Sequence, residues 1–239
     1  MDQLIGTLVK VLLFAFVAGM FTLVIRGFVR SGQEGRRIRK GWAELERTAG
    51  ARGWTYERRA AGRATEYCGV GPMPGSGDNL TAWHHMTGEF RGRSFGCFEY
   101  RYANPLSGSG RPGGAKELTF ESVFLVSAPG SGPFLQVGRP GRMDVLMGRG
   151  PRTLLGVPEF DDRFRVDTHD DAFARNLLDG ELRAFLLSDD RAPKNPLRVR
   201  DDELFTWYTG TLSPQAVEER LNYLCDVLDR IPAQTWAAG

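Results

Sequence analysis

Cysteine is scarce in this sequence of 239 residues, which holds only three. Cys68, Cys97 and Cys225 are odd in number, and no two of them have a C-x-x-C spacing. A disulfide framework needs paired cysteines and a structural zinc site needs clustered ligands, so the sequence argues against both. The pattern also favours a reducing compartment.

The chain also lacks a surplus of basic residues outside its N-terminal end. The formal net charge is +2, but residues 1–40 hold seven basic and two acidic residues. Residues 41–239 therefore hold 24 basic and 27 acidic residues, a net charge of about −3. A nucleic-acid-binding domain needs a basic face of its own, so we expect no nucleic-acid partner.

The N-terminal end contains one long apolar run. From Leu4 to Ile25 the only strongly polar side chain is Lys10. A helix of that length reaches roughly 33 Å, enough to cross a hydrocarbon core of about 30 Å. No Lys or Arg precedes the run, as a cleaved signal peptide would require. The sequence predicts an uncleaved transmembrane anchor over residues 1–30. The alternative is a buried core helix, which the lack of a polar face disfavours.

Basic residues follow the predicted span. They are Arg26, Arg30, Arg36, Arg37, Arg39 and Lys40, with Glu34 the only acid among them. The positive-inside rule then places the C-terminal body in the cytoplasm of a single-pass cell-membrane protein. The same cluster is expected to bind anionic lipid headgroups. We expect residues 31–50 to form a basic juxtamembrane amphipathic helix.

Residues 51–239 are predicted to form an α+β domain. A hydrophobic period near two predicts strands at Trp54–Arg58, Thr81–Phe90, Ser94–Tyr102, Leu118–Val126, Phe134–Val137, Arg163–Val166, Leu197–Arg200 and Leu204–Tyr208. Glycine-rich stretches at 69–79, 103–116 and 127–133 are predicted to be mobile connections. Helical spacing predicts either one kinked helix or two short ones over Ala172–Leu187, and a last helix with Ser213 as N-cap. This order predicts a mainly antiparallel sheet with helices covering one face.

The densest run of reactive side chains lies between Asp161 and Asp171. Asp161, Asp162, Asp167 and Asp170 could supply oxygen ligands to Mg²⁺ or Ca²⁺, or His169 with a carboxylate could act as a general base. The run lacks the alternating ligands and central glycine of a calcium loop, and no second histidine is near. We favour the alternative, in which Thr168 and the aspartates cap a helix and pair with arginines on a solvated strand face. No metal and no cofactor are expected.

Two glycine motifs match catalytic or nucleotide-binding patterns by sequence alone. Gly92–Gly96 reads G-R-S-F-G, with Ser94 as the candidate nucleophile, but that motif needs a strand before the serine and a helix after it. Strand-like sequence on both sides of Ser94 instead predicts a hairpin. Gly108–Gly113 reads G-S-G-R-P-G and is likewise followed by strand-like sequence, where a dinucleotide site needs a helix.

Other side chains with binding potential have simpler explanations. His84 and His85 are adjacent in a predicted strand, so they are expected to point to opposite faces and not to share a metal. An aromatic set could line a ligand groove, although sheet packing is the commoner use of such residues. The set comprises Trp54, Trp83, Tyr100, Tyr102, Trp207 and Tyr208.

Four segments carry a resemblance to a known group. They read RGWTYERR, FRGRSFGCFEYRY, FDDRFRVDTHDDAFARNLLDGELRAFLL and LNYLCDVLDRIP. In them the chain resembles a group of uncharacterised, single-span membrane proteins common in actinobacteria. The resemblance implies the anchored architecture and supplies no activity and no site residue.

The sequence therefore predicts a membrane-anchored, cytoplasm-facing binding or scaffolding domain that is not an enzyme. Its expected partners are a bilayer with anionic headgroups and a membrane or cytosolic protein. One alternative is a membrane-bound hydrolase or divalent-metal enzyme that uses Ser94 or the Asp161–Asp171 region. Another is an extracytoplasmic binding domain, should the charge rule fail.

Overall fold

The computed structural model describes residues 20, 36, 38–103, 118–140 and 153–236. Contacts divide the chain into two units, Met1–Ala43 and Glu44–Gly239. In the first unit, the described residues 20, 36 and 38–43 are helical. The predicted span lies outside the described residues apart from Met20, as do Arg26, Arg30 and Arg37. Within the described part of the chain, no helix combines the length and apolarity needed to span a bilayer.

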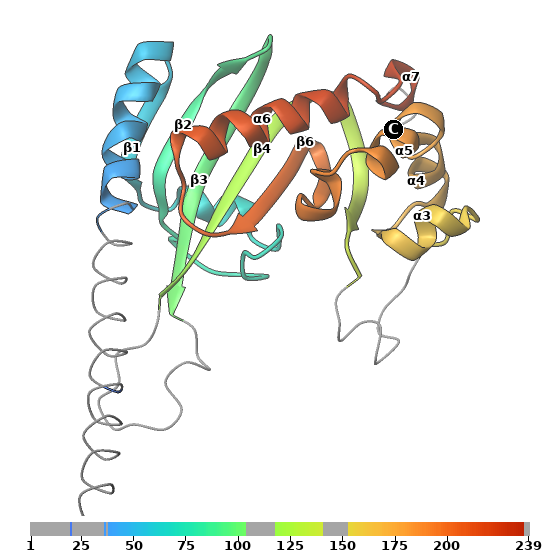
Figure 1. Cartoon of the computed structure of the whole chain (residues 1–239), viewed down its shortest axis with the longest axis horizontal. Helices are drawn as coiled ribbons and strands as arrows, with labels where there is room; N and C mark the ends of the chain where they lie inside the picture. The colour runs from blue at the N-terminus through green and yellow to red at the C-terminus, as the bar shows by residue number, and fades with distance from the viewer. Residues whose placement is uncertain (1–19, 21–35, 37, 104–117, 141–152, 237–239) are drawn as a thin grey trace, which may run out of the picture. The chain divides into compact units, whose positions relative to one another are not determined.

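The second unit is an α+β domain, which confirms that part of the predicted fold (Figure 1). Six strands of the described chain form one antiparallel sheet. They are β1 (Thr55–Ala60), β2 (Ala82–Phe90), β3 (Arg93–Ala103), β4 (Leu118–Gly138), β5 (Arg165–Thr168) and β6 (Leu197–Thr209). The strands β1, β2, β3 and β4 are neighbours in that order, and β4 also pairs with β5 and β6.

Strand β4 is longer than predicted and organises the sheet. Its first half pairs with β3 and its last residues pair with β5, while β6 runs along both halves. The prediction of a mobile loop over 127–133 between two strands was wrong, and β6 is likewise one strand instead of two. The register shifts between Ser127 and Leu135, so the glycines mark a bulge. A Cβ on Gly132 would lie 2.6 Å from the Phe173 ring, so glycine there permits close packing.

The helices are short except one. They are α3 (Pro158–Arg163), α4 (Asp171–Leu177), α5 (Gly180–Ser188), α6 (Pro214–Leu228) and α7 (Ala233–Trp236), with 3-10 turns η1 (Arg63–Tyr67) and η2 (Ala192–Lys194). The region 172–187 forms two helices because Asp179 caps α5 and Gly180 has a φ of 51°. Ser213 caps α6 as predicted, with its side chain accepting from the Ala216 N–H at 3.2 Å. Helix α3 was not predicted.

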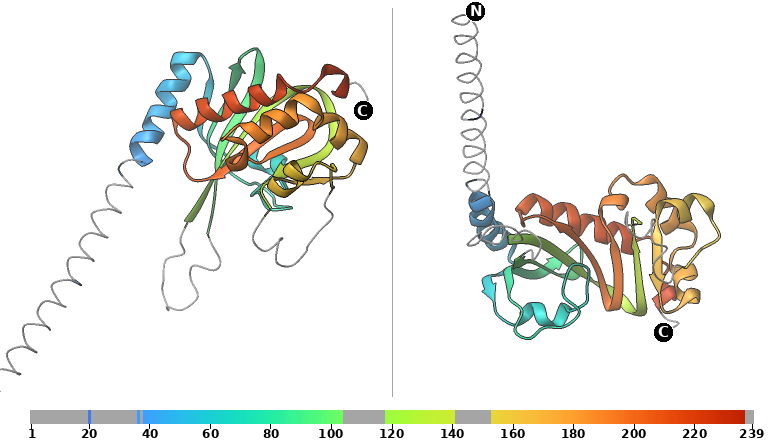
Figure 2. Two further views of the ribbon diagram at one scale, coloured as in Figure 1. Left: turned by 45° about the vertical axis from the view of Figure 1, so that its right-hand side comes forward. Right: turned by 90° about the horizontal axis from the view of Figure 1, so that it is seen from below.

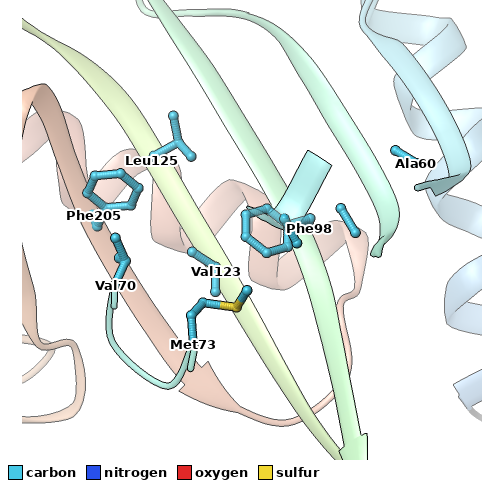
Figure 3. Packing of buried hydrophobic residues seen from close by; sticks show 9 residues of the cluster. Ala60, Val70, Met73, Phe98, Val123, Leu125 and Phe205 are labelled. Carbon is cyan, nitrogen blue, oxygen red and sulfur yellow. The ribbon is translucent and has the colours of Figure 1, made fainter. Parts of the chain in front are cut away.

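Both faces of the sheet are covered, which corrects the prediction of one covered face. Helix α6 lies on one face, and residues 61–81 with η1 lie on the other (Figure 2). The segment 69–79, predicted to be a mobile connection, inserts Val70 and Met73 into a cluster on the sheet (Figure 3). The other buried members are Ala60, Ala64, Ala82, Phe98, Val123, Leu125 and Phe205. Burial of the apolar side chains of Val70 and Met73 therefore holds the segment 69–79 against the sheet.

Helical residues 44–52 begin the folded domain. Leu45 and Ala49 are fully buried. The helix ends at Gly53, whose φ is 69°, and the Trp54 N–H donates to the Ala49 carbonyl at 2.9 Å. The chain then reverses, so helical residues 44–52 and β1 run in opposite directions (Figure 1).

Candidate functional site

Asp161 organises the backbone that leads into α3. One carboxylate oxygen accepts from the Leu155 N–H at 3.0 Å, and the other accepts from Gly156 at 3.0 Å and Val157 at 3.1 Å. The side chain is buried, whereas the neighbouring Asp162 is exposed. Both oxygens of Asp161 are therefore committed to backbone donors at a helix N-terminus.

The aspartates that follow make local contacts of the same kind. Asp170 is the N-cap of α4 and accepts from the Phe173 N–H at 2.9 Å, so it and not Thr168 is the cap. Asp167 pairs with Arg165 at 2.9 Å, and Asp171 accepts from the Thr153 hydroxyl at 2.7 Å. Among the described residues, no group of three or more His, Cys, Asp or Glu is placed to hold a metal ion.

Ser94 and His169 lie on different parts of the sheet. Ser94 is exposed, next to the β2–β3 hairpin turn at Arg91 and Gly92. Its neighbour Phe95 pairs with Val126 of β4, while the His169 N–H donates to the Phe134 carbonyl further along β4. About eight residues of β4 separate these points, on the order of 20 Å of strand. The structure does not bring the two side chains together as a catalytic pair needs.

The two adjacent histidines have separate surroundings. His84 lies in a bulge of β2 with φ of 51°, is 2% exposed, and its Nδ1 lies 2.8 Å from the Tyr56 hydroxyl. Burial lowers the pKa of His84 to about 4, with Arg101 and Arg58 contributing. His85 faces Glu57 of β1, and burial lowers its pKa as well. The pair makes no common site.

The aromatic set is distributed over the sheet. Trp54 packs against Phe95 with ring centroids 4.7 Å apart, and Tyr208 stacks on Phe124 at 5.9 Å. Trp207 packs against the segment that covers the other face, where a Cβ on Gly71 would lie 2.5 Å from its ring. These residues serve separate packing contacts and do not line one groove.

A polar pocket occupies the open part of the sheet where β4 lies between β5 and β6. Gln136 pairs with Asp167 on one side and Arg198 on the other, so the three side chains share one face. A cavity of about 240 Å³ lies there. It is lined by Gln136, Gly138, Arg139, Arg165 and Asp167, which we call the arginine pocket.

The guanidinium groups around the arginine pocket are held in place. Arg165 Nε donates to both oxygens of Asp167, at 2.9 and 3.1 Å. Arg198 donates twice to the Gln136 side-chain oxygen, at 3.0 and 2.7 Å, and also to the Gly69 carbonyl. Burial and the nearby Arg200 lower the pKa of Arg198. Fixed guanidinium groups are suited to bind acceptor oxygens of a ligand.

Arg139 differs from the other two arginines. It is exposed, and no described carboxylate lies within ion-pair distance of it. Because Asp167 neutralises Arg165, Arg139 supplies the uncompensated positive charge at the cavity. Sequence reasoning missed the pocket because its residues come from the end of β4 and from β5, which are separate in the chain and meet only through strand pairing.

A second cavity, of about 370 Å³, lies near α5 and the start of α7. Its lining residues are Asn176, Asp179, Gly180, Glu181, Pro232, Gln234 and Thr235. Asp179 there already accepts from the Gly180 N–H at 2.8 Å as the cap of α5. Because this cavity lacks prearranged cationic donors, we take the arginine pocket as the better candidate site.

Among solved structures, the chain is similar to the crystal structure of the mycobacterial trehalose monomycolate transport factor A, TtfA. The TM-score is 0.56 and the sequence identity is 15%, over 80% of this chain and 94% of that chain. The two proteins thus share a fold. No protein-family model matches the chain, and no curated protein matches it.

Proposed function

We propose that this chain is a non-enzymatic binding domain tethered to a membrane, and that it holds an oxygen-rich polar group in the arginine pocket. The observation that carries the proposal is that Arg165, which lines the cavity beside Arg139, is already held in place by Asp167. Side chains that are already ordered lose little conformational freedom when a ligand binds. A pocket whose side chains are already ordered is therefore suited to binding a ligand.

The size of the pocket restricts what it can hold. About 240 Å³ is below the usual range for drug-sized ligands, roughly 300–1,000 Å³. The pocket fits one polar group of a larger molecule, such as a headgroup or a side chain, with acceptor oxygens facing Arg139 and Arg165. The Asp167 carboxylate and the Gln136 amide offer further hydrogen-bonding positions.

Binding at the pocket can be tested with the full chain purified from membranes in mild detergent. Native mass spectrometry would identify bound molecules in the wild type, in Arg139→Glu and in the control Lys194→Glu. Lys194 is exposed and lies outside the pocket. We expect Arg139→Glu to lose the bound species and Lys194→Glu to retain it. Equal retention by both variants would contradict the proposed site.

The proposal of a membrane tether is inferred from the apolar run within residues 1–30 and from the basic cluster between Arg26 and Lys40. A C-terminal tag on the full chain would be tested for protease access in whole cells and after permeabilisation. Protection until permeabilisation is the result expected for a cytoplasm-facing domain. Digestion in intact cells would instead make this an extracytoplasmic binding domain.

The shared fold with a transport factor supports a finer proposal about the process. We propose that the domain assists the movement of an amphiphilic envelope lipid as an accessory factor, without catalysing a reaction. Depletion of the protein should then leave the synthesis of such a lipid intact and reduce its arrival at the outer envelope. Pulse labelling followed by fractionation would measure both, and unchanged delivery would contradict the proposal.

A further inference from the structure

We propose that one end of the folded domain docks directly on an anionic bilayer surface. The contact surface consists of Arg58, Arg59, Trp83, Arg101, Leu118 and Phe120, and we call it the Trp83 surface. The proposal rests on the membrane tether of the proposed function and adds a second lipid contact, within the domain itself.

Strand pairing places most of these side chains on one face of the sheet. Arg59 pairs with Trp83, and Trp83 pairs with Glu99. Two positions further along β3, Arg101 pairs with Phe120 of β4, and the next pair on that face contains Leu118. The faces of β1, β2, β3 and β4 therefore contribute to one continuous surface.

The aromatic and cationic groups of this surface contact one another. The Arg101 guanidinium lies 4.2 Å from the centre of the Trp83 ring, and that of Arg59 lies 5.4 Å from it. Leu118 is 55% exposed, which is unusual for a large apolar residue in this domain. An exposed leucine beside a tryptophan and arginines is the composition of a membrane-interface contact.

Two acidic residues near the Trp83 surface, Glu99 and Glu121, are turned inwards. Glu99 is fully buried and accepts from Arg101 Nε at 2.6 Å and from the Leu212 N–H at 3.0 Å. Glu121 is 5% exposed and accepts from the Thr209 hydroxyl at 3.0 Å. Arg58 and Arg59 are exposed and outnumber the one exposed acid of β1, Glu57, so this strand presents a net positive charge to solvent.

The opposite end of the sheet is different. At the β2–β3 hairpin, Arg91 pairs with Asp226 at 2.7 Å and with Asp229 at 2.6 Å. Arg93 also pairs with Asp229, at 2.8 Å. The arginines of the hairpin are thus neutralised by α6, whereas Arg58 and Arg59 of the Trp83 surface are exposed.

The Trp83 surface lies at the end of the domain where the chain arrives from its N-terminal segment. Strand β1 runs from Thr55, opposite Thr87, to Ala60, opposite Ala82, so Arg58 and Arg59 lie at its far end. The chain reverses at Gly53, so residue 44 lies towards that same end, roughly 12 Å from residue 52 along the helix. The chain that leads to the predicted anchor therefore joins the domain at this end.

The test uses the full chain in nanodiscs of phosphatidylcholine, with or without phosphatidylglycerol. An environment-sensitive fluorophore is attached at Leu118→Cys in a Cys68→Ser background, since Cys97 and Cys225 are buried. A label at Ser94→Cys reports on the opposite, exposed end. We expect a blue-shifted, brighter signal at position 118 only, and only in discs with phosphatidylglycerol.

Charge-reversal variants test whether the arginines attract the domain to the anionic bilayer, or whether position 118 lies near the bilayer for another reason. Arg58→Glu with Arg59→Glu should weaken the contact by roughly thirty-fold or more and abolish the shift at position 118. Lys194→Glu reverses a charge at an exposed position away from this end and outside the arginine pocket, and should preserve the shift. The label at Ser94→Cys should be unchanged in both, which reports that the domain is folded.

The outcomes are distinguishable. A shift that persists in the Arg58 and Arg59 double variant, or one of equal size without phosphatidylglycerol, would overturn the docking proposal. A chain that enters the discs but gives no response at position 118 would overturn it while leaving the tether intact. Failure of the full chain to enter any disc would overturn the tether, and docking with it.

Discussion

At the scale of single residues, Asp161 is predicted to act on stability. Its carboxylate accepts hydrogen bonds from the backbone N–H groups of Leu155, Gly156 and Val157. Removing the carboxylate would leave these three N–H groups without their acceptor. We expect Asp161→Ala to lower the free energy of unfolding by about 2–3 kcal/mol in urea titrations of the full chain in detergent. Asp162→Ala, at the exposed neighbour, should cost under about 0.5 kcal/mol. Equal effects of the two variants would refute the structural role.

His84 is predicted to make stability depend on pH. Its folded pKa of about 4 lies below the ordinary 6.5, so the unfolded chain takes up the proton first. The contribution of the neutral ring is present above about pH 6.5 and is lost as pH falls towards 4. We expect the wild type to lose about 2 kcal/mol more than His84→Asn between pH 7 and pH 4.5. Asparagine tolerates the positive φ at this position.

Urea titrations at the two pH values would measure this difference. The exposed His169→Asn serves as the control for removal of a histidine. If His84→Asn lost as much stability on acidification as the wild type, protonation of His84 would not be the cause.

At the scale of elements, the segment 61–81 acts as a packed cover. Gly71 has φ of 55°, and a Cβ there would lie 2.5 Å from the Trp207 ring. Gly69 has φ of 78°, but a Cβ there would meet no atom within 4 Å. We expect Gly69→Ala to cost about 1 kcal/mol, for backbone strain alone, and Gly71→Ala to cost about 3 kcal/mol. Similar losses of unfolding free energy in urea would show that the ring contact contributes nothing.

The elements also differ in how well the sequence predicted them. The final helix was predicted correctly because Ser213, Pro214 and the apolar stripe are local signals. Strand β4 was predicted as two pieces because Gly130 and Gly132 look like a loop in sequence. Their neighbours are Trp236 and Phe173, from parts of the chain that local patterns do not connect to them.

At the scale of the whole molecule, contacts place the boundary of the folded domain between Ala43 and Glu44. We expect a fragment of residues 44–239 to unfold cooperatively, because it retains Leu45 and Ala49 in its core. A fragment of residues 53–239 loses both and should melt at a clearly lower temperature, since deleting one buried leucine alone costs about 2–5 kcal/mol. Thermal unfolding followed by circular dichroism would compare them. If the two fragments melted at the same temperature, helical residues 44–52 would not contribute to the stability of the core.

The sequence by itself determined the features that depend on near neighbours in the chain. These are the apolar run with its basic flank, the α+β class with a mainly antiparallel sheet, and the hairpin at Ser94. Each follows from periodicity, charge or capping within a short window. The tertiary structure alone decided which side chains meet across the sheet. The arginine pocket joins the end of β4 to β5, and the Trp83 surface joins β1 to β4, because strand register fixes those pairings and no local pattern encodes them.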